Sequence, residues 1–188
     1  MDSFLKIHCC LYLLYRTAAA KCCFMKHLFV HCCLLLLLVA TTGCPYEADV
    51  PLDDPSVPIP IQLPGTWVNA DDSMERVIIT AADAYRFNIS YYSDTTGAER
   101  FSAHLSLLRQ TWFLNLKPLG SVRGLRGPYA FYRFDLSPNG NRITLTPVTE
   151  NITERFNASR QLRRFFLKHM HNSFFYDGDE VIQYDKLQ

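Results

Sequence analysis

Hydrophobic and polar residues alternate with a period of two over much of residues 85–145. Successive side chains of a β-strand point to opposite faces of a sheet, so this pattern predicts strands with one buried face. The apolar positions are Tyr85, Phe87, Ile89 and Tyr91; Phe101, Ala103, Leu105 and Leu107; Trp112, Leu114 and Leu116; Ala130, Tyr132, Phe134 and Leu136; and Ile143 and Leu145. Turn-forming residues separate these runs at 94–97, 120–128 and 137–141. We therefore predict a mainly β fold, an antiparallel meander or barrel-like sheet of about six to eight strands.

One segment near the C-terminus changes to a helical period. Its apolar positions are Leu162, Phe165, Phe166 and Met170. This spacing predicts one C-terminal helix at about 158–171, with Asn151 or Asn157 as the N-cap. A final alternating strand follows at 181–187. We expect the helix to lie as a plug or lid over an open end of the sheet.

An apolar run precedes all of these elements. Residues 28–40 are largely apolar, and they follow the basic residues Lys26 and His27. Three small residues then lead to Cys44. This order is typical of a signal peptide, which we place at residues 25–43. An uncleaved membrane anchor is the alternative, although a span of about 20 residues would include Lys26 and His27. Either interpretation places the folded part outside the cytosol, and the anchor would also hold it at a membrane.

Residues 1–24 fit neither a domain nor a linker. A signal peptide normally begins at the N-terminus, so we expect Met25 to be the true start and residues 1–24 to be a mis-assigned extension. A longer basic region before the apolar run is the alternative. The Cys-Cys doublets of this stretch lack the Cys-x-x-Cys spacing of zinc sites, and we expect no metal site there.

A proline-rich stretch follows the apolar run. Residues 44–64 contain six prolines and four acidic residues, and proline favours an extended backbone over a packed core. We predict a tether that, at about 3.1 Å per residue, holds the folded part some 60 Å from a membrane. The β-domain would then occupy residues 65–188, which is long enough for one hydrophobic core.

Charge argues against nucleic acid as a partner. Residues 45–188 contain 15 Lys or Arg against 17 Asp or Glu, whereas a nucleic-acid-binding domain is basic. The predicted helix is the exception, and we assign four of its residues to possible contact with an anionic surface: Arg160, Arg163, Arg164 and Lys168. Anionic lipid headgroups, peptidoglycan and an acidic envelope protein are the candidate partners. A solvated helix face is the alternative.

Catalytic chemistry is not indicated. No cysteine follows Cys44, and there is no Gly-x-Ser-x-Gly motif. His104 lies on the polar stripe of its strand together with Ser102 and Ser106, and we expect it to be a solvated surface residue. We therefore predict that the protein is not an enzyme and that it has no cofactor or metal site.

Two motifs carry a resemblance to known families. The sequence Thr41-Thr42-Gly43-Cys44 resembles the lipobox of bacterial lipoproteins, which implies a diacylglyceryl group on Cys44. The sequence Gly65-Thr66-Trp67 is similar to the start of lipocalin-like β-domains, and we expect Trp67 to pack across the closed end of a barrel. Together with residues 157–169, these motifs make the chain resemble a group of small bacterial lipoproteins.

Two functions are consistent with these observations. The first is a binding or interaction module of the bacterial cell envelope, held at a membrane by lipid on Cys44. The second, implied by the lipocalin-like resemblance, is a carrier of a small apolar ligand. Pro45 is not the aspartate that retains lipoproteins in the inner membrane of enteric bacteria. In a Gram-negative host we therefore expect the outer membrane.

Overall fold

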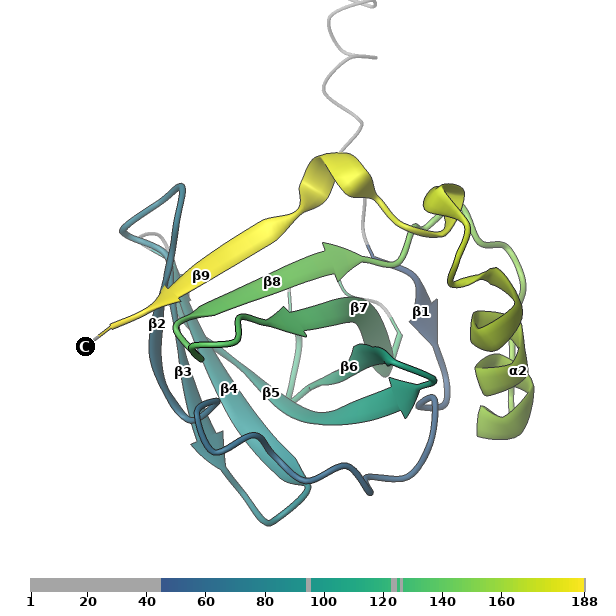
Figure 1. Cartoon of the computed structure of the whole chain (residues 1–188), viewed down its shortest axis with the longest axis horizontal. Coiled ribbons are helices and arrows are strands. Elements are labelled where there is room, and N and C mark those ends of the chain that lie inside the picture. The colour runs from purple at the N-terminus through teal and green to yellow at the C-terminus, as the bar shows by residue number, and fades with distance from the viewer. Residues whose placement is uncertain (1–44, 94–95, 123–124, 126, 188) are drawn as a thin grey trace, which may run out of the picture. The chain divides into compact units, whose positions relative to one another are not determined.

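The alternating runs form the strands of a closed antiparallel barrel (Figure 1). The computed structural model of the protein describes residues 45–93, 96–122, 125 and 127–187, so the predictions for residues 1–44 lie outside the described residues. The barrel strands are β2 (Gly65–Asn69), β3 (Arg76–Ala81), β4 (Arg86–Ser93), β5 (Thr96–Leu108), β6 (Thr111–Pro118), β7 (Tyr129–Leu136), β8 (Arg142–Pro147) and β9 (Ile182–Lys186). Neighbours in the chain pair with each other, and β9 closes the barrel between β8 and β2. The predicted mainly β, barrel-like fold with one C-terminal helix is confirmed.

The connections between strands differ at the two ends of the barrel. Short turns join β3 to β4, β5 to β6 and β7 to β8 at one end, which we call the hairpin end. The connection from β8 to β9, at the other end, is long and contains three helices. These are α2 (Ser159–His169) and two single-turn 3-10 helices, η1 (Ser173–Phe175) and η2 (Gly178–Glu180).

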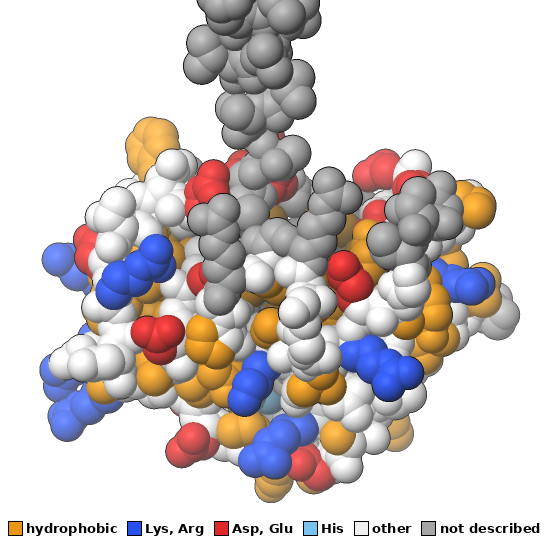
Figure 2. Space-filling model, turned by 180° about the vertical axis from the view of Figure 1, so that it is seen from behind, with side chains coloured by type: hydrophobic (Ala, Val, Ile, Leu, Met, Phe, Trp, Pro, Cys, Tyr) orange, Lys and Arg blue, Asp and Glu red, His pale blue; other side chains and the backbone are white. Residues whose placement is uncertain are grey.

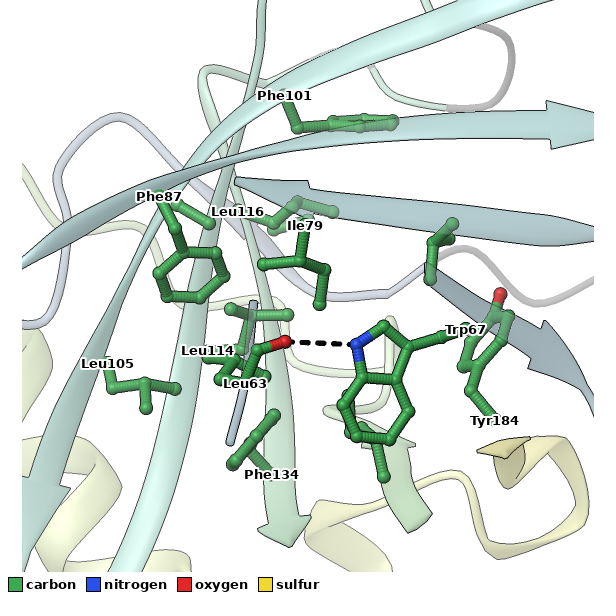
Figure 3. Packing of buried hydrophobic residues seen from close by; sticks show 14 residues of the cluster. Leu63, Trp67, Ile79, Phe87, Phe101, Leu105, Leu114, Leu116, Phe134 and Tyr184 are labelled. Carbon is green, nitrogen blue, oxygen red and sulfur yellow. Dashed lines mark hydrogen bonds between the residues drawn. The ribbon is translucent and has the colours of Figure 1, made fainter. Parts of the chain in front are cut away.

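Inward-facing side chains fill the barrel with one hydrophobic cluster. Its buried members are Leu63, Trp67, Val77, Ile79, Phe87, Phe101, Ala103, Leu105, Leu114, Leu116, Ala130, Phe134, Ile143 and Tyr184. Trp67 has no exposed surface, and its indole Nε1 donates a hydrogen bond of 3.0 Å to the carbonyl oxygen of Leu63 (Figure 3). A buried indole needs such an acceptor. The prediction that Trp67 is a structural residue of the barrel is confirmed.

Residues 45–64 pack along the barrel, and they do not form the extended tether that we predicted. We call them the strap. Tyr46, Leu52 and Leu63 of the strap are all at most 1% exposed. The physical reason is an alternation within the proline-rich stretch, where apolar residues stand between the prolines and acids. These residues are Tyr46, Ala48, Val50 and Leu52, and then Val57, Ile59 and Leu63.

The strap runs from β1 (Glu47–Ala48) around the barrel to β2, as Figure 1 shows. β1 adds a short ninth strand beside β7. The chain then crosses the hairpin end, where the amide of Ile59 donates to the carbonyl oxygen of Ala84 at 3.0 Å. The compact unit that holds the barrel therefore includes the strap and spans Gly43–Gln188.

α2 packs against the outer wall of the barrel and does not cover an end, as we had expected. Its buried residues Leu162 and Phe166 face outward-pointing side chains of β6 and β7. The Phe166 ring centroid lies 5.3 Å from that of Phe113 and 5.4 Å from that of Phe131. The helix starts close to the predicted position, but its N-cap is Ala158, which makes no side-chain capping bond. Neither predicted asparagine cap is used.

Candidate anionic-surface interface

Three cationic side chains form a line along the outer face of α2. Arg160, Arg164 and Lys168 are spaced by four residues and are all exposed, which places them on one face of the helix. Leu162 and Phe166 occupy the opposite, buried face. We call these three residues the cationic ridge. Seen from behind, the molecule carries several Lys and Arg side chains along the edge that α2 occupies, and acidic side chains are interspersed among the basic ones over this face (Figure 2).

The ridge residues have no acidic partner among the described residues. The ion pairs formed in that part of the chain, at distances of up to 4.0 Å, involve other cations, namely Arg86, Arg133, Arg142 and Arg163. Unpaired cations on a helix surface remain available to an external anion.

Arg163 differs from the other three residues that we assigned to this surface. Its guanidinium Nη1 lies 2.5 Å from Asp53 Oδ2, and its Nη2 donates to the carbonyl oxygen of Leu107 at 3.2 Å. The side chain therefore joins α2 to the strap and to β5. The predicted set of four separates into a ridge of three and one structural residue.

A polar network lies where the strap crosses the outer wall. The Asn115 Oδ1 accepts from the amide of Leu52 at 2.8 Å, and the Asn115 Nδ2 donates to Ser106 Oγ at 2.8 Å. The Ser106 hydroxyl donates in turn to the carboxylate of Asp53. Asn115 and Ser106 have no exposed surface. These contacts satisfy polar groups that the strap would otherwise bury without partners.

His104 belongs to this network, and the prediction that it is a solvated surface residue is wrong. It faces outward from the barrel as predicted, but the strap covers it and leaves it 6% exposed. Its Nε2 lies 3.0 Å from the carbonyl oxygen of Asp53. Burial is the main cause that lowers the pKa of His104, against the opposing effect of Asp53. The Ser106 hydroxyl, on the same face of β5, is bonded to Asp53 and Asn115.

A pocket of about 210 Å³ opens beside β1. It is lined by Glu47, Ala48, Asp49, Gly127, Arg155 and Phe156. The Glu47 carboxylate accepts from the amide of Gly127 at 2.5 Å, and Arg155 donates to the Glu47 carbonyl oxygen at 3.0 Å. Two of the charged side chains in the pocket are therefore engaged in holding β1 in place.

Tyrosine hydroxyls and a carboxylate meet between β3, β4 and β9. The Tyr184 hydroxyl donates to Glu75 Oε1 at 3.0 Å, and Asn69 Nδ2 donates to Glu75 Oε2 at 2.7 Å. Burial, together with hydrogen bonding to Glu75, raises the pKa of Tyr91 to about 12. These tyrosines are hydrogen-bond donors at neutral pH, and they anchor the carboxylate of Glu75, the residue that precedes β3.

In the described ranges, no three His, Cys, Asp or Glu side chains are grouped so that they could hold a metal ion. No helix of those same ranges is both long and apolar enough to cross a bilayer. Comparisons with family models, with curated proteins and with solved structures find no match for this chain.

Proposed function

We propose that this protein is a lipid-anchored binding module of the bacterial cell envelope, which meets an anionic partner through the cationic ridge. The observation that carries the proposal is the line of Arg160, Arg164 and Lys168, which is exposed and has no ion-pair partner in the described part of the chain. Each cation near an anionic surface contributes about 1 kcal/mol. The lipid on Cys44 would hold this weak surface at high local concentration.

The packing of the barrel favours a role as a scaffold, and it argues against a carrier of small apolar ligands. Ligand pockets usually occupy about 300–1,000 Å³. In this barrel the inward positions are taken by large side chains such as Trp67, Phe87 and Phe134, all at most 3% exposed. The strap also crosses the hairpin end, and its Leu63 is buried in the cluster inside the barrel. Carrier function would instead require thermal stabilisation of the protein by an apolar ligand.

The anchor is tested by the intact mass of protein extracted from membranes, compared with a Cys44→Ala variant. We expect a mass equal to residues 44–188 plus a diacylglyceryl or triacyl group, and loss of that group in the variant. An unmodified mass that retains Met1 or Met25 would contradict the lipid anchor.

The ridge is tested with a soluble form that starts at Pro45, because residues 45–187 contain the whole barrel, the strap, the hydrophobic cluster inside the barrel and a second cluster between the outer wall, the strap and α2. We would measure its sedimentation with phosphatidylglycerol vesicles and with purified peptidoglycan. The triple variant Arg160→Glu, Arg164→Glu and Lys168→Glu should bind about a hundredfold more weakly to whichever surface is the partner. The matched control reverses three exposed strand cations, Arg76, Arg100 and Lys117. Equal losses in both variants would show a nonspecific effect of net charge.

A further inference from the structure

The exit point of the chain from the folded body lies beside an exposed aromatic side chain. Pro45 pairs with Thr149, and the amide of Thr149 donates to the carbonyl oxygen of Phe175 at 3.1 Å. Phe175 ends η1, and its neighbour Phe174 is 86% exposed. Two strand spacings, about 10 Å, thus separate the backbone at Pro45 from that of η1.

η1 is held firmly, so the exposure of Phe174 is not that of a loose loop. The Phe175 ring is buried, and its centroid lies 5.0 Å from that of Phe166 on α2. The amide of Phe174 donates to Asn172 Oδ1 at 3.0 Å, which caps the turn. The Phe174 side chain therefore points outward from a fixed support, and the core does not require it there.

Because the strap is packed against the barrel, a lipid on Cys44 would have almost no spacer. Consecutive Cα atoms are 3.8 Å apart, so Cys44 follows Pro45 at that distance. The surface around Pro45 must then face the membrane that holds the lipid. We infer that Phe174 inserts into the interfacial layer of that membrane and orients the barrel on it; this inference rests on the lipid anchor of the proposed function.

The exposure of an apolar side chain does not by itself identify the surface that faces the membrane. Ile61 is equally exposed, at 89%, but it lies at the other end of the strap, beside Gln62, whose carbonyl oxygen accepts from Lys186. Figure 1 shows the C-terminal end, next to Lys186, on the opposite side of the barrel from α2. The position of the exit at Pro45 distinguishes the two sites.

The charged residues near η1 do not favour an electrostatic contact with anionic lipid, and we expect the contact of Phe174 with the membrane to be apolar. Lys168, the last residue of the cationic ridge, precedes η1, and the acids Asp177, Asp179 and Glu180 follow it. Since acidic residues outnumber Lys168 in this stretch, insertion of Phe174 should not require anionic lipid. This separates the contact from that of the cationic ridge, which should require anionic groups.

The test uses the full-length protein purified from membranes and reconstituted into vesicles whose acyl chains carry bromine, a quencher of tryptophan fluorescence. One variant is Phe174→Trp, and the matched control is Ile61→Trp. The unsubstituted protein gives the background from Trp67 and Trp112. An interfacial side chain lies about 5–10 Å into the headgroup and acyl boundary, so emission from position 174 should fall about twofold. Emission from position 61 should not change.

The intact mass of the same preparation is also measured, because it distinguishes a failure of the lipid anchor from a failure of the Phe174 inference. If Cys44 carries lipid and position 174 is not quenched, the inference is overturned and the anchor stands. If quenching at position 174 requires phosphatidylglycerol, the contact is electrostatic and the apolar insertion is overturned. A mass without lipid overturns the anchor and this inference with it.

Discussion

Arg163 of α2 and Asp53 of the strap are 110 residues apart in sequence, and their side chains meet at 2.5 Å. The contact joins the C-terminal helix to the segment that precedes the barrel. Both are held on the outer wall, where the Asp53 carboxylate also accepts from Ser106. The ion pair thus fixes two covering elements to each other and to β5.

Removal of this cation should destabilise the folded body. Arg163→Ala leaves the partly buried Asp53 carboxylate without its charged donor, and we expect a loss of about 1–3 kcal/mol in the free energy of unfolding. Urea unfolding of residues 45–188 measures the loss. The control Arg164→Ala alters an exposed ridge residue and should change stability by less than about 0.5 kcal/mol. Equal effects of the two substitutions would contradict the structural role of Arg163.

Asn115 should matter more than a polar residue on an exposed strand. The substitution Asn115→Ala leaves the amide of Leu52 buried without its acceptor at 2.8 Å. An unsatisfied buried donor costs about 1–3 kcal/mol. The control is Asn88→Ala, at an exposed position of β4. It should change the free energy of unfolding by less than about 0.5 kcal/mol. Hydrogen exchange at Leu52 provides a local readout, because its amide should lose protection in the Asn115 variant before global unfolding.

Stability should depend on pH through His104. Burial lowers the pKa of His104 in the folded protein below the unfolded value of about 6.5. Above that pH both states carry a neutral ring, and the full stability is present. As the pH falls below about 6.5, the unfolded chain takes up a proton that the folded protein does not, so stability falls by up to about 1.4 kcal/mol per pH unit.

The measurement is the free energy of unfolding at pH 7.5 and at pH 5.5, for the unchanged protein and for His104→Gln. The unchanged protein should lose more stability than the variant between the two values. The exposed His171→Gln is the control. A pH slope that survives in the His104 variant would assign the effect to another group.

Substitution of Gly140 should destabilise the protein, because its positive φ and the nearby side chain of Gln62 both favour glycine. Its φ is +69°, and an added Cβ would lie 2.7 Å from the Cγ of Gln62 on the strap. We expect Gly140→Ala to cost about 1–3 kcal/mol. Gly97→Ala, where a Cβ meets nothing within 4 Å, is the control. The added Cβ would also lie 2.8 Å from the Cβ of Gln62, so the second change is Gln62→Gly. If Gly140→Ala costs much less in that background, contact with the strap dominates; if its cost is unchanged, the backbone conformation does.

The strands and the helix could be predicted because their signals are local. The alternation at Phe101, Ala103 and Leu105 places these residues on one face of a strand wherever that strand pairs. The spacing of Leu162 and Phe166 likewise marks one helix face. Trp67 could be assigned to the core for the same reason, since a large aromatic in an alternating strand is buried more often than not.

The candidate interface could be predicted only in part. Helical spacing groups Arg160, Arg164 and Lys168, but it does not reveal that Arg163 turns toward Asp53. That contact depends on a strap that the proline content led us to treat as a spacer. The period-two alternation of Tyr46, Ala48, Val50 and Leu52 was the signal that could have found the strap.

The sequence by itself determined the β class, the helix and its cationic residues, because periodicity and residue type act over a few neighbouring positions. Only the tertiary structure decided that β9 closes the barrel, that the strap covers the outer wall, and that His104 is buried beneath it. These outcomes depend on contacts between residues tens of positions apart. Polar residues on an outward stripe have the same pattern whether water or another segment covers them, so burial there is decided by what folds over the strand.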